Sequence, residues 1–238
     1  FKKVQYPRMH LVMLCLFSVL IISFRSLVRN SNSYTKDELL GKINHASDPG
    51  FSKIPSKYCM REGMYLRTEV LEAFIELYKN AEDENIKLVV ISATRPFNQQ
   101  KSIWDRKWGR VQYMGWQDIE KARDILKYSS MPGTSRHHWG TDLDLNALEN
   151  SYFETKVGKE VYDFLERCGG ELGFSQVYTS KSNGRTGYEE EKWHWSYMPV
   201  SSLMLEDYNE IITTKDIAGF NGSAIADSLQ IIDNFVNG

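Results

Sequence analysis

The sequence lacks an excess of charge of either sign. Its 29 lysine and arginine residues almost balance its 31 aspartate and glutamate residues, so that the formal net charge of the 238-residue chain is -2. A protein that binds nucleic acid presents a basic patch or stripe to the phosphates. We therefore expect no nucleic-acid partner. The chain is 42% hydrophobic and 13% aromatic, which is enough for a packed core and excludes a disordered protein.

Cysteine is also scarce, with three residues in the whole chain. Cys15 lies inside an apolar run and is followed by further apolar residues, so it does not have the position of a lipidated cysteine that ends a signal. Cys59 and Cys168 could pair in an exported protein. The sequence does not show whether their Cα atoms come within bonding reach. We expect two free, buried thiols, and a disulfide remains the alternative.

An unbroken apolar run, LVMLCLFSVLIISF, occupies residues 11–24 and follows Lys2, Lys3 and Arg8. It is shorter than the ~20 residues of a membrane-spanning helix and matches the apolar region of a secretory signal, about 7–15 residues. The charged flank argues against a buried core helix, and no A-x-A cleavage site follows. We expect residues 1–33 to form a cleaved signal peptide or an uncleaved membrane anchor with a linker. The protein is then exported, to the periplasm or cell envelope.

The rest of the chain, residues 34–238, lacks internal repeats and a regular alternation of strands and helices. Periodic apolar residues predict helices, and β-branched or alternating runs predict strands. We expect helices at residues 66–81, 98–108, 119–128, 157–168 and 224–236, and strands at 86–95, 141–145 and 192–198. This mixture predicts one α+β domain, with a small central antiparallel sheet flanked by helices.

The stretch SRHHWGTDLDL, residues 135–145, brings together His137, His138, Asp142 and Asp144. The alternation of its last residues predicts a strand that carries both aspartates on one face. Alternation does not choose between the two aspartates, and periodicity does not choose between the two histidines. The stretch supplies metal-binding residue types without deciding which of them bind.

A second cluster, EEEKWHWSY, contains Glu191 and His194. Residues three apart on a straight strand point to opposite faces, so Glu191 must lie in the turn before the strand, or the strand must bulge. Two histidines, an aspartate and an open position make a plausible catalytic zinc site. A nearby carboxylate can act as general base. The spacing is not that of the helical H-E-x-x-H motif.

Arg95 ends an apolar strand and begins a turn. A guanidinium group there could bind a substrate carboxylate through two parallel hydrogen bonds. The alternative is an internal salt bridge. Trp193, between Glu191 and His194 in the chain, is the tryptophan best placed to line a cleft.

Three segments resemble the VanY-like zinc D-alanyl-D-alanine carboxypeptidases. SRHHWGTDLD resembles their S-x-H-x-x-G-x-x-x-D signature, EKWH their E-x-W-H, and SATRPFNQQ their S-G-Y-R-S-x-x-x-Q segment. The order and rough separation of the segments also match. The resemblance implies an α+β fold, one Zn²⁺ per chain held by His137, Asp144 and His194, and Glu191 as the catalytic base.

The same matching implies that Arg95 holds or polarises the substrate, with Gln100 and Ser135 as further substrate-binding residues. The family usually has a small residue in place of Asp142, and His138 and Trp139 are also bulky departures.

We expect a zinc-dependent carboxypeptidase that cleaves the C-terminal, D-Ala-D-Ala type, bond of peptidoglycan stem peptides by Glu-assisted attack of water. An L,D-carboxypeptidase, a D,D-dipeptidase or a peptidoglycan endopeptidase would use the same site. A non-catalytic cell-wall binding module is a further alternative.

Overall fold

The computed structural model describes residues 34–238, so the predicted signal peptide or anchor lies outside the described residues. The chain divides into Phe1–Thr35 and Lys36–Gly238, and the second unit contains every element given below. Within residues 34–238, no helix combines the length and the apolar character needed to cross a membrane.

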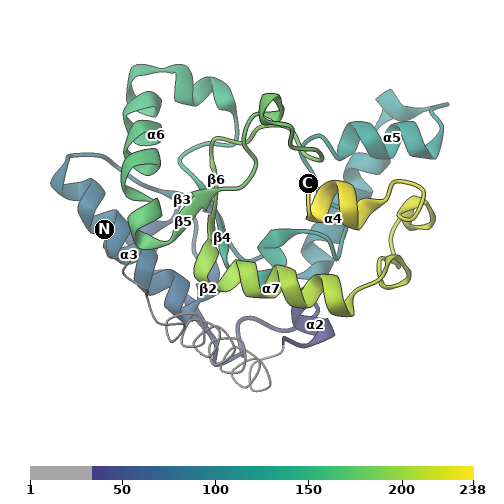
Figure 1. The fold of residues 1–238 in the computed structure, drawn as a ribbon, viewed down its shortest axis with the longest axis horizontal. Coiled ribbons are helices and arrows are strands. Elements are labelled where there is room, and N and C mark those ends of the chain that lie inside the picture. Colours follow the sequence, from purple (N-terminus) through teal and green to yellow (C-terminus); the bar gives the residue numbers. More distant parts are fainter. Residues whose placement is uncertain (1–33) are drawn as a thin grey trace, which may run out of the picture. The chain divides into compact units, whose positions relative to one another are not determined.

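The centre of the second unit is a four-stranded sheet in the order β3-β4-β6-β5 (Figure 1). Its strands are β3 (Val90–Ser92), β4 (Asp142–Leu145), β5 (Phe174–Gln176) and β6 (His194–Tyr197), and every neighbouring pair is antiparallel. A separate antiparallel pair joins β1 (Phe51–Lys53) to β2 (Tyr65–Arg67). The predicted α+β class with a small antiparallel sheet is confirmed, although β3 is much shorter than the predicted strand at residues 86–95.

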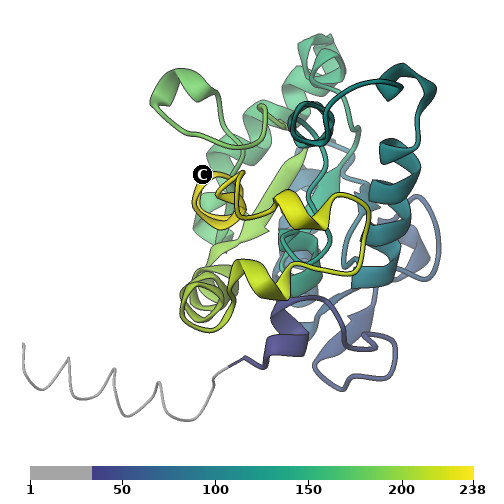
Figure 2. The ribbon, with the colours of Figure 1, turned by 90° about the vertical axis from the view of Figure 1, so that its right-hand side faces the viewer.

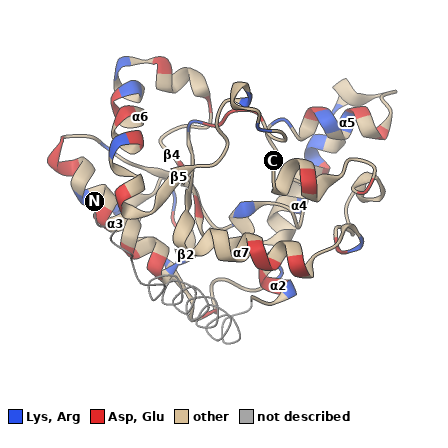
Figure 3. Cartoon of the chain, viewed as in Figure 1, with Lys and Arg blue, Asp and Glu red and all other residues tan. Residues whose placement is uncertain are grey.

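Helices flank this sheet, as predicted. They are α2 (Lys36–Leu39), α3 (Thr68–Asp83), α4 (Phe97–Trp108), α5 (Asp118–Ile125), α6 (Lys156–Cys168) and α7 (Met198–Ile211). In Figure 1, α3 and α6 lie to one side of the sheet, and α4 and α5 lie to the other. Figure 3 shows acidic and basic residues interspersed along α3, α5 and α6.

One face of the sheet is apolar and packs on the helices. Leu143, Leu145 and Trp195 on β4 and β6 are buried with Phe74 of α3 and Phe164 of α6 in one core cluster. Burial of each such side chain contributes about 1.5–3 kcal/mol. A slip of one residue would move this apolar set to the polar face of the sheet and the polar set into the apolar core. The core therefore fixes which residues of β4 and β6 face the opposite, polar side.

The chain after α7 differs from the prediction of a continuous helix at residues 224–236. It forms a 3-10 turn at Ser223–Ile225 and a π-helix at Ile232–Val236, and Figure 2 shows this segment winding irregularly. Gln230 between them has a φ of 46°, which costs a non-glycine residue roughly 1–2 kcal/mol. The apolar side chains Leu229 and Val236 are buried nonetheless, so packing overrides helical periodicity here.

The cysteines Cys59 and Cys168 are both free and only half-buried. The expectation of free thiols is confirmed, and that of full burial is wrong.

Candidate metal centre and cleft

The pairing of β4 with β6 places the polar residues of both strands on one face. Asp144 lies opposite His194 and Asp142 lies opposite Ser196 in the antiparallel register. Side chains directly opposite each other in a sheet share a face. The alternation predicted for residues 141–145 is therefore present, with both aspartates on the face away from the core.

His137 reaches this face from the 3-10 turn Arg136–Trp139 that precedes β4. Gly140 ends the turn with a φ of +74°, and a Cβ atom there would lie 2.3 Å from the Phe51 ring. Only glycine fits both requirements. The Arg95 backbone N–H donates to the His137 carbonyl at 2.9 Å, which ties the turn to the segment after β3.

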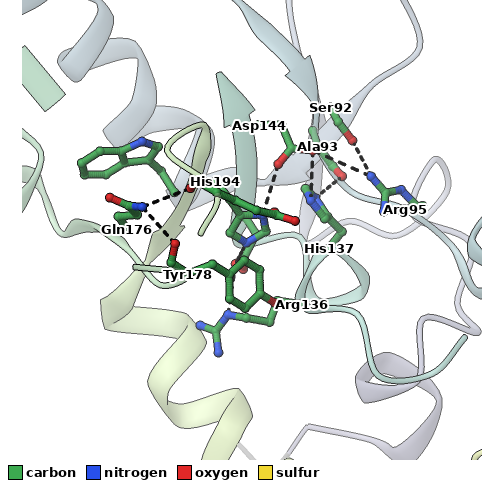
Figure 4. Close-up of polar contacts among 12 residues, drawn as sticks. Ser92, Ala93, Arg95, Arg136, His137, Asp144, Gln176, Tyr178 and His194 are labelled. Carbon is green, nitrogen blue, oxygen red and sulfur yellow. Dashed lines mark hydrogen bonds and ion pairs between the residues drawn. The ribbon is translucent and has the colours of Figure 1, made fainter. Parts of the chain in front are cut away.

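His137, Asp144 and His194 form a compact, buried cluster. One possible ligand atom from each lies within 4.8 Å of the others. The His137 Nε2 atom is 3.2 Å from Asp144 Oδ2, and the His194 Nδ1 atom is 3.1 Å from Asp144 Oδ1. Figure 4 shows the three side chains pointing toward one another. The structure thus brings together the three residues predicted as metal ligands.

The chemistry of these donors fits a zinc ion. The Nδ1–H group of His137 donates to the Ala93 carbonyl at 2.9 Å, so its Nε2 lone pair faces the cluster. Two imidazole nitrogens and a carboxylate are the donors of catalytic zinc sites, and such a hydrogen bond to the far nitrogen fixes the tautomer that binds metal. Burial would raise the pKa of Asp144, but the adjoining His137 and His194 hold it well below its usual range.

Glu191 lies in the turn directly before β6, one of the two arrangements predicted from its spacing to His194. The His194 backbone N–H donates to the Glu191 carbonyl at 3.2 Å, and Glu191 Oε2 lies 3.8 Å from His194 Nδ1. Burial is the main cause that raises the pKa of Glu191 to about 7, against the opposing effect of His194. A carboxyl group with this pKa can both accept and return a proton near neutrality.

Arg95 follows β3 and is held by two neighbours. Its Nη1 donates to Gln100 Oε1 at 2.8 Å and its Nη2 donates to Ser92 Oγ at 2.9 Å. Nη2 also lies 3.8 Å from Asp144 Oδ2. The predicted alternative, an internal salt bridge, is therefore present as a long contact with Asp144. Arg95 also lines the cleft.

A cavity of about 570 Å³ opens over the cluster. Its walls include Glu191, Arg95 and two of the predicted substrate contacts, Ser135 and Trp193. Gln100, also predicted to bind substrate, is fully buried. It contacts Arg95 instead and donates to the Ser130 carbonyl at 2.7 Å, so the structure assigns it a supporting position behind the guanidinium.

The cavity is also lined by residues that the sequence did not single out. Lys107 of α4 lines it, as do Tyr128 and Tyr178 from loops. The Tyr178 ring packs 4.6 Å from that of His194. Residue spacing along α4 could have placed Lys107 one turn after Ile103, but no pattern indicated that this side of α4 faces the site.

His138, the second histidine of the motif, points away from the cluster and is fully buried. Its Nδ1–H donates to the Arg95 carbonyl at 2.6 Å, and its Nε2 accepts from the Gly133 N–H at 3.0 Å. Burial lowers its pKa to about 3, so the ring is neutral. His138 therefore braces the backbone of Arg95 and is a core histidine.

Comparison with known proteins places these observations in a family. The family model described as "VanY: D-alanyl-D-alanine carboxypeptidase" matches residues 63–200, more than half of the chain. The chain belongs to this VanY family. The predicted family of carboxypeptidases is thereby confirmed, and the matched region contains every predicted site residue.

A curated relative is the D-alanyl-D-alanine carboxypeptidase of Enterococcus faecalis, 27% identical over 141 residues that cover 56% of this chain and 51% of that protein. The chain spans about half the length of the curated relatives it matches.

Two solved structures show the same fold. VanYB in complex with D-Alanine-D-Alanine has 22% identity and a TM-score of 0.50, and the match covers 67% of this chain and 88% of that one. The LdcB LD-carboxypeptidase has 23% identity and a TM-score of 0.51, with 68% and 74% covered. The VanY-like fold predicted for the chain is confirmed.

Proposed function

We propose that this protein is a zinc-dependent carboxypeptidase that removes the C-terminal residue of peptidoglycan stem peptides. The observation that carries the proposal is the convergence of three kinds of group on one cavity: a buried metal-ligand set, the carboxyl group of Glu191, and the guanidinium of Arg95. The names of the E. faecalis relative and of the VanYB complex support D-Ala-D-Ala as the substrate type.

His137, Asp144 and His194 would hold one Zn²⁺ per chain. When bound, zinc supplies Lewis-acid chemistry by lowering the pKa of a water molecule and polarising a carbonyl. All three residues line the cavity, so a zinc ion held by them would be accessible to a substrate bound there.

Glu191 moves the proton in this proposal. Its carboxylate accepts a proton from the attacking water as the oxygen adds to the peptide carbonyl carbon, and its carboxyl group then donates that proton to the leaving amine as the C–N bond breaks. The position of Glu191 Oε2, 3.8 Å from His194 Nδ1, supports this role because it lies beside the predicted ligand set.

Arg95 binds the terminal carboxylate of the peptide. Guanidinium carries five N–H donors in a fixed plane, and only two donor groups are used by Gln100 and Ser92. The remaining donors can form the parallel pair of hydrogen bonds that a carboxylate accepts. Ser135 and Trp193 line the same cavity and would contact the peptide.

The substrate lies outside the cytoplasm, so the proposed function requires export. Residues 1–33, as a signal peptide or membrane anchor, would direct residues 34–238 to the cell envelope as the catalytic domain.

The test is digestion of purified pentapeptide and tetrapeptide muropeptides, with and without a chelator, followed by mass spectrometry. We expect chelator-sensitive loss of one D-Ala from the pentapeptide. Loss from the tetrapeptide alone would make the enzyme an L,D-carboxypeptidase, release of a dipeptide would make it a dipeptidase, and cleavage of cross-linked dimers would make it an endopeptidase. Unchanged muropeptides would contradict the proposal.

A further inference from the structure

His194 lies between two carboxylates. Its Nδ1 atom is 3.1 Å from Asp144 Oδ1 and its Nε2 atom is 2.9 Å from Asp142 Oδ1. Glu191 lies on the same side of the ring, with its Oε2 atom 3.8 Å from His194 Nδ1. His194 would therefore offer Nδ1 to a metal held at the cluster, and its Nε2 would carry the ring proton and donate a hydrogen bond to Asp142.

Asp142 is fully buried. Its Oδ1 atom also accepts from Arg136 Nε at 3.1 Å, and its Oδ2 atom accepts from the Thr141 hydroxyl. A buried carboxylate is tolerated when it is paired and hydrogen-bonded in this way.

Arg136 is almost fully buried as well and is held in place from three sides. Its Nη2 atom donates to Ser196 Oγ at 2.9 Å, and Ser196 in turn donates to Ser201 Oγ at 2.9 Å. The guanidinium also lies over the Trp139 ring, 4.8 Å from its centroid. Figure 4 shows Arg136 on the opposite side of His194 from Asp144.

The two histidine ligands are thus supported differently. The far nitrogen of His137 meets a neutral carbonyl, that of Ala93. The far nitrogen of His194 meets a carboxylate whose charge Arg136 balances. A carboxylate partner orients a ligand histidine and raises its basicity.

We propose that Asp142 is a positioning residue for the metal. It holds His194 in the tautomer and orientation that present Nδ1 to the ion, while Arg136 neutralises its charge so that the sheet tolerates a second buried carboxylate. This inference rests on the proposed function only in that His194 binds zinc.

The first test is zinc affinity of the full chain by chelator competition. Replacing Asp142 by Asn (D142N) should weaken zinc binding about 10- to 100-fold, the usual cost of losing such a partner. The control Ser201→Ala alters the far end of the same buried network, four contacts from His194 through Asp142, Arg136 and Ser196, and should bind zinc as the wild type does.

A double variant separates positioning from charge balance. D142N alone leaves Arg136 as an unpaired buried cation, which also repels the metal. Arg136→Met combined with D142N removes both charges, so we expect tighter zinc binding than in D142N alone but weaker binding than in the wild type. Wild-type affinity in D142N or in the double variant would overturn the positioning role.

A second measurement needs no variant. Nitrogen-15 NMR of the zinc-loaded wild type should show His194 protonated at Nε2 and bound through Nδ1. Protonation at Nδ1 would overturn the inference while leaving zinc binding intact. A wild-type chain that binds no zinc would overturn the metal site and this inference together.

Discussion

The cavity has two walls that are built in different ways. The metal wall consists of His137, Asp144, Glu191 and His194, and every one of these side chains is buried on the sheet or in the turns beside it. The helix wall consists of Ile103 and Lys107 on α4 and of Tyr128–Ser130 in the loop after α5, and Tyr128 is 54% exposed.

The metal wall owes its rigidity to the core behind it. Leu143, Leu145 and Trp195 fix the register that sets Asp144 opposite His194, so the positions of the reacting groups are set by folding. The helix wall has no such backing at its exposed end. In the proposed function the chemistry belongs to the buried wall, and we expect substrate preference to depend more on the exposed one.

Removing a predicted metal ligand should have the largest effect on zinc binding and activity. His137→Ala should abolish both zinc binding and hydrolysis, because a catalytic zinc site uses three protein ligands and this variant keeps only two. Zinc content after purification and muropeptide turnover measure the two effects. The matched control is Lys101→Ala on α4, outside the cleft, which should retain zinc and activity. Full activity in His137→Ala would refute the ligand assignment.

Glu191→Gln should lower kcat about 10²- to 10⁴-fold, the range for loss of a general base, while zinc stays bound. The amide keeps the shape of the side chain but cannot accept a proton. Steady-state kinetics and metal analysis together check the result, and the adjacent Glu190→Gln serves as control. Loss of zinc in Glu191→Gln would place this residue among the ligands instead.

Arg95→Lys should lower kcat/KM by about 10- to 100-fold, equivalent to a charged hydrogen bond of roughly 1.5–3 kcal/mol. A lysine keeps the charge but loses the planar fork that pairs with a carboxylate. Kinetics on peptides with a free and an amidated C-terminus measure the effect. An equal loss on both peptides would indicate that Arg95 does not bind the terminal carboxylate.

The pH dependence tests the burial of Glu191. Its pKa is raised to about 7, and the protonated carboxyl group cannot act as base. A bound zinc ion favours the carboxylate and lowers this pKa, so kcat/KM should fall as the pH drops below about 7, approaching about tenfold per unit at the acid end. The acid limb should be absent from the residual rate of Glu191→Gln. If the Glu191→Gln variant shows the same fall of kcat/KM at low pH, a group other than Glu191 causes it.

A substitution in the helix wall should have the smallest effect on the kinetic constants. Lys107 Nζ is held by Ser129 Oγ at 2.9 Å and lies at the cavity, where it can attract an anionic peptide. Lys107→Ala should raise KM about two- to fivefold with kcat unchanged, in line with a partly exposed ion pair. A large fall in kcat would instead place Lys107 in the chemistry and remove the distinction between the walls.

Much of this protein could be predicted from its sequence. The alternation in TDLDL predicted β4 and the shared face of Asp142 and Asp144, and apolar periodicity predicted α3, α4, α5 and α6. The helix expected at residues 224–236 was wrong: the positive φ of Gln230 separates a 3-10 turn from a π-helix, and Ile231 directly after it is fully buried beside Leu229 and Val236.

The sequence by itself determined the types of group available at the site and, through its resemblance to a family, predicted which of them bind metal. Only the tertiary structure decided what neighbouring residues in one motif do. His137 and His138 differ because one ring meets Asp144 and the other meets the Arg95 carbonyl. Asp144 faces the ligand set while Asp142 faces Arg136. Some of these partners lie in the same motif, but Ala93, Arg95 and His194 lie more than forty residues away in the chain, and local patterns carry no information about them.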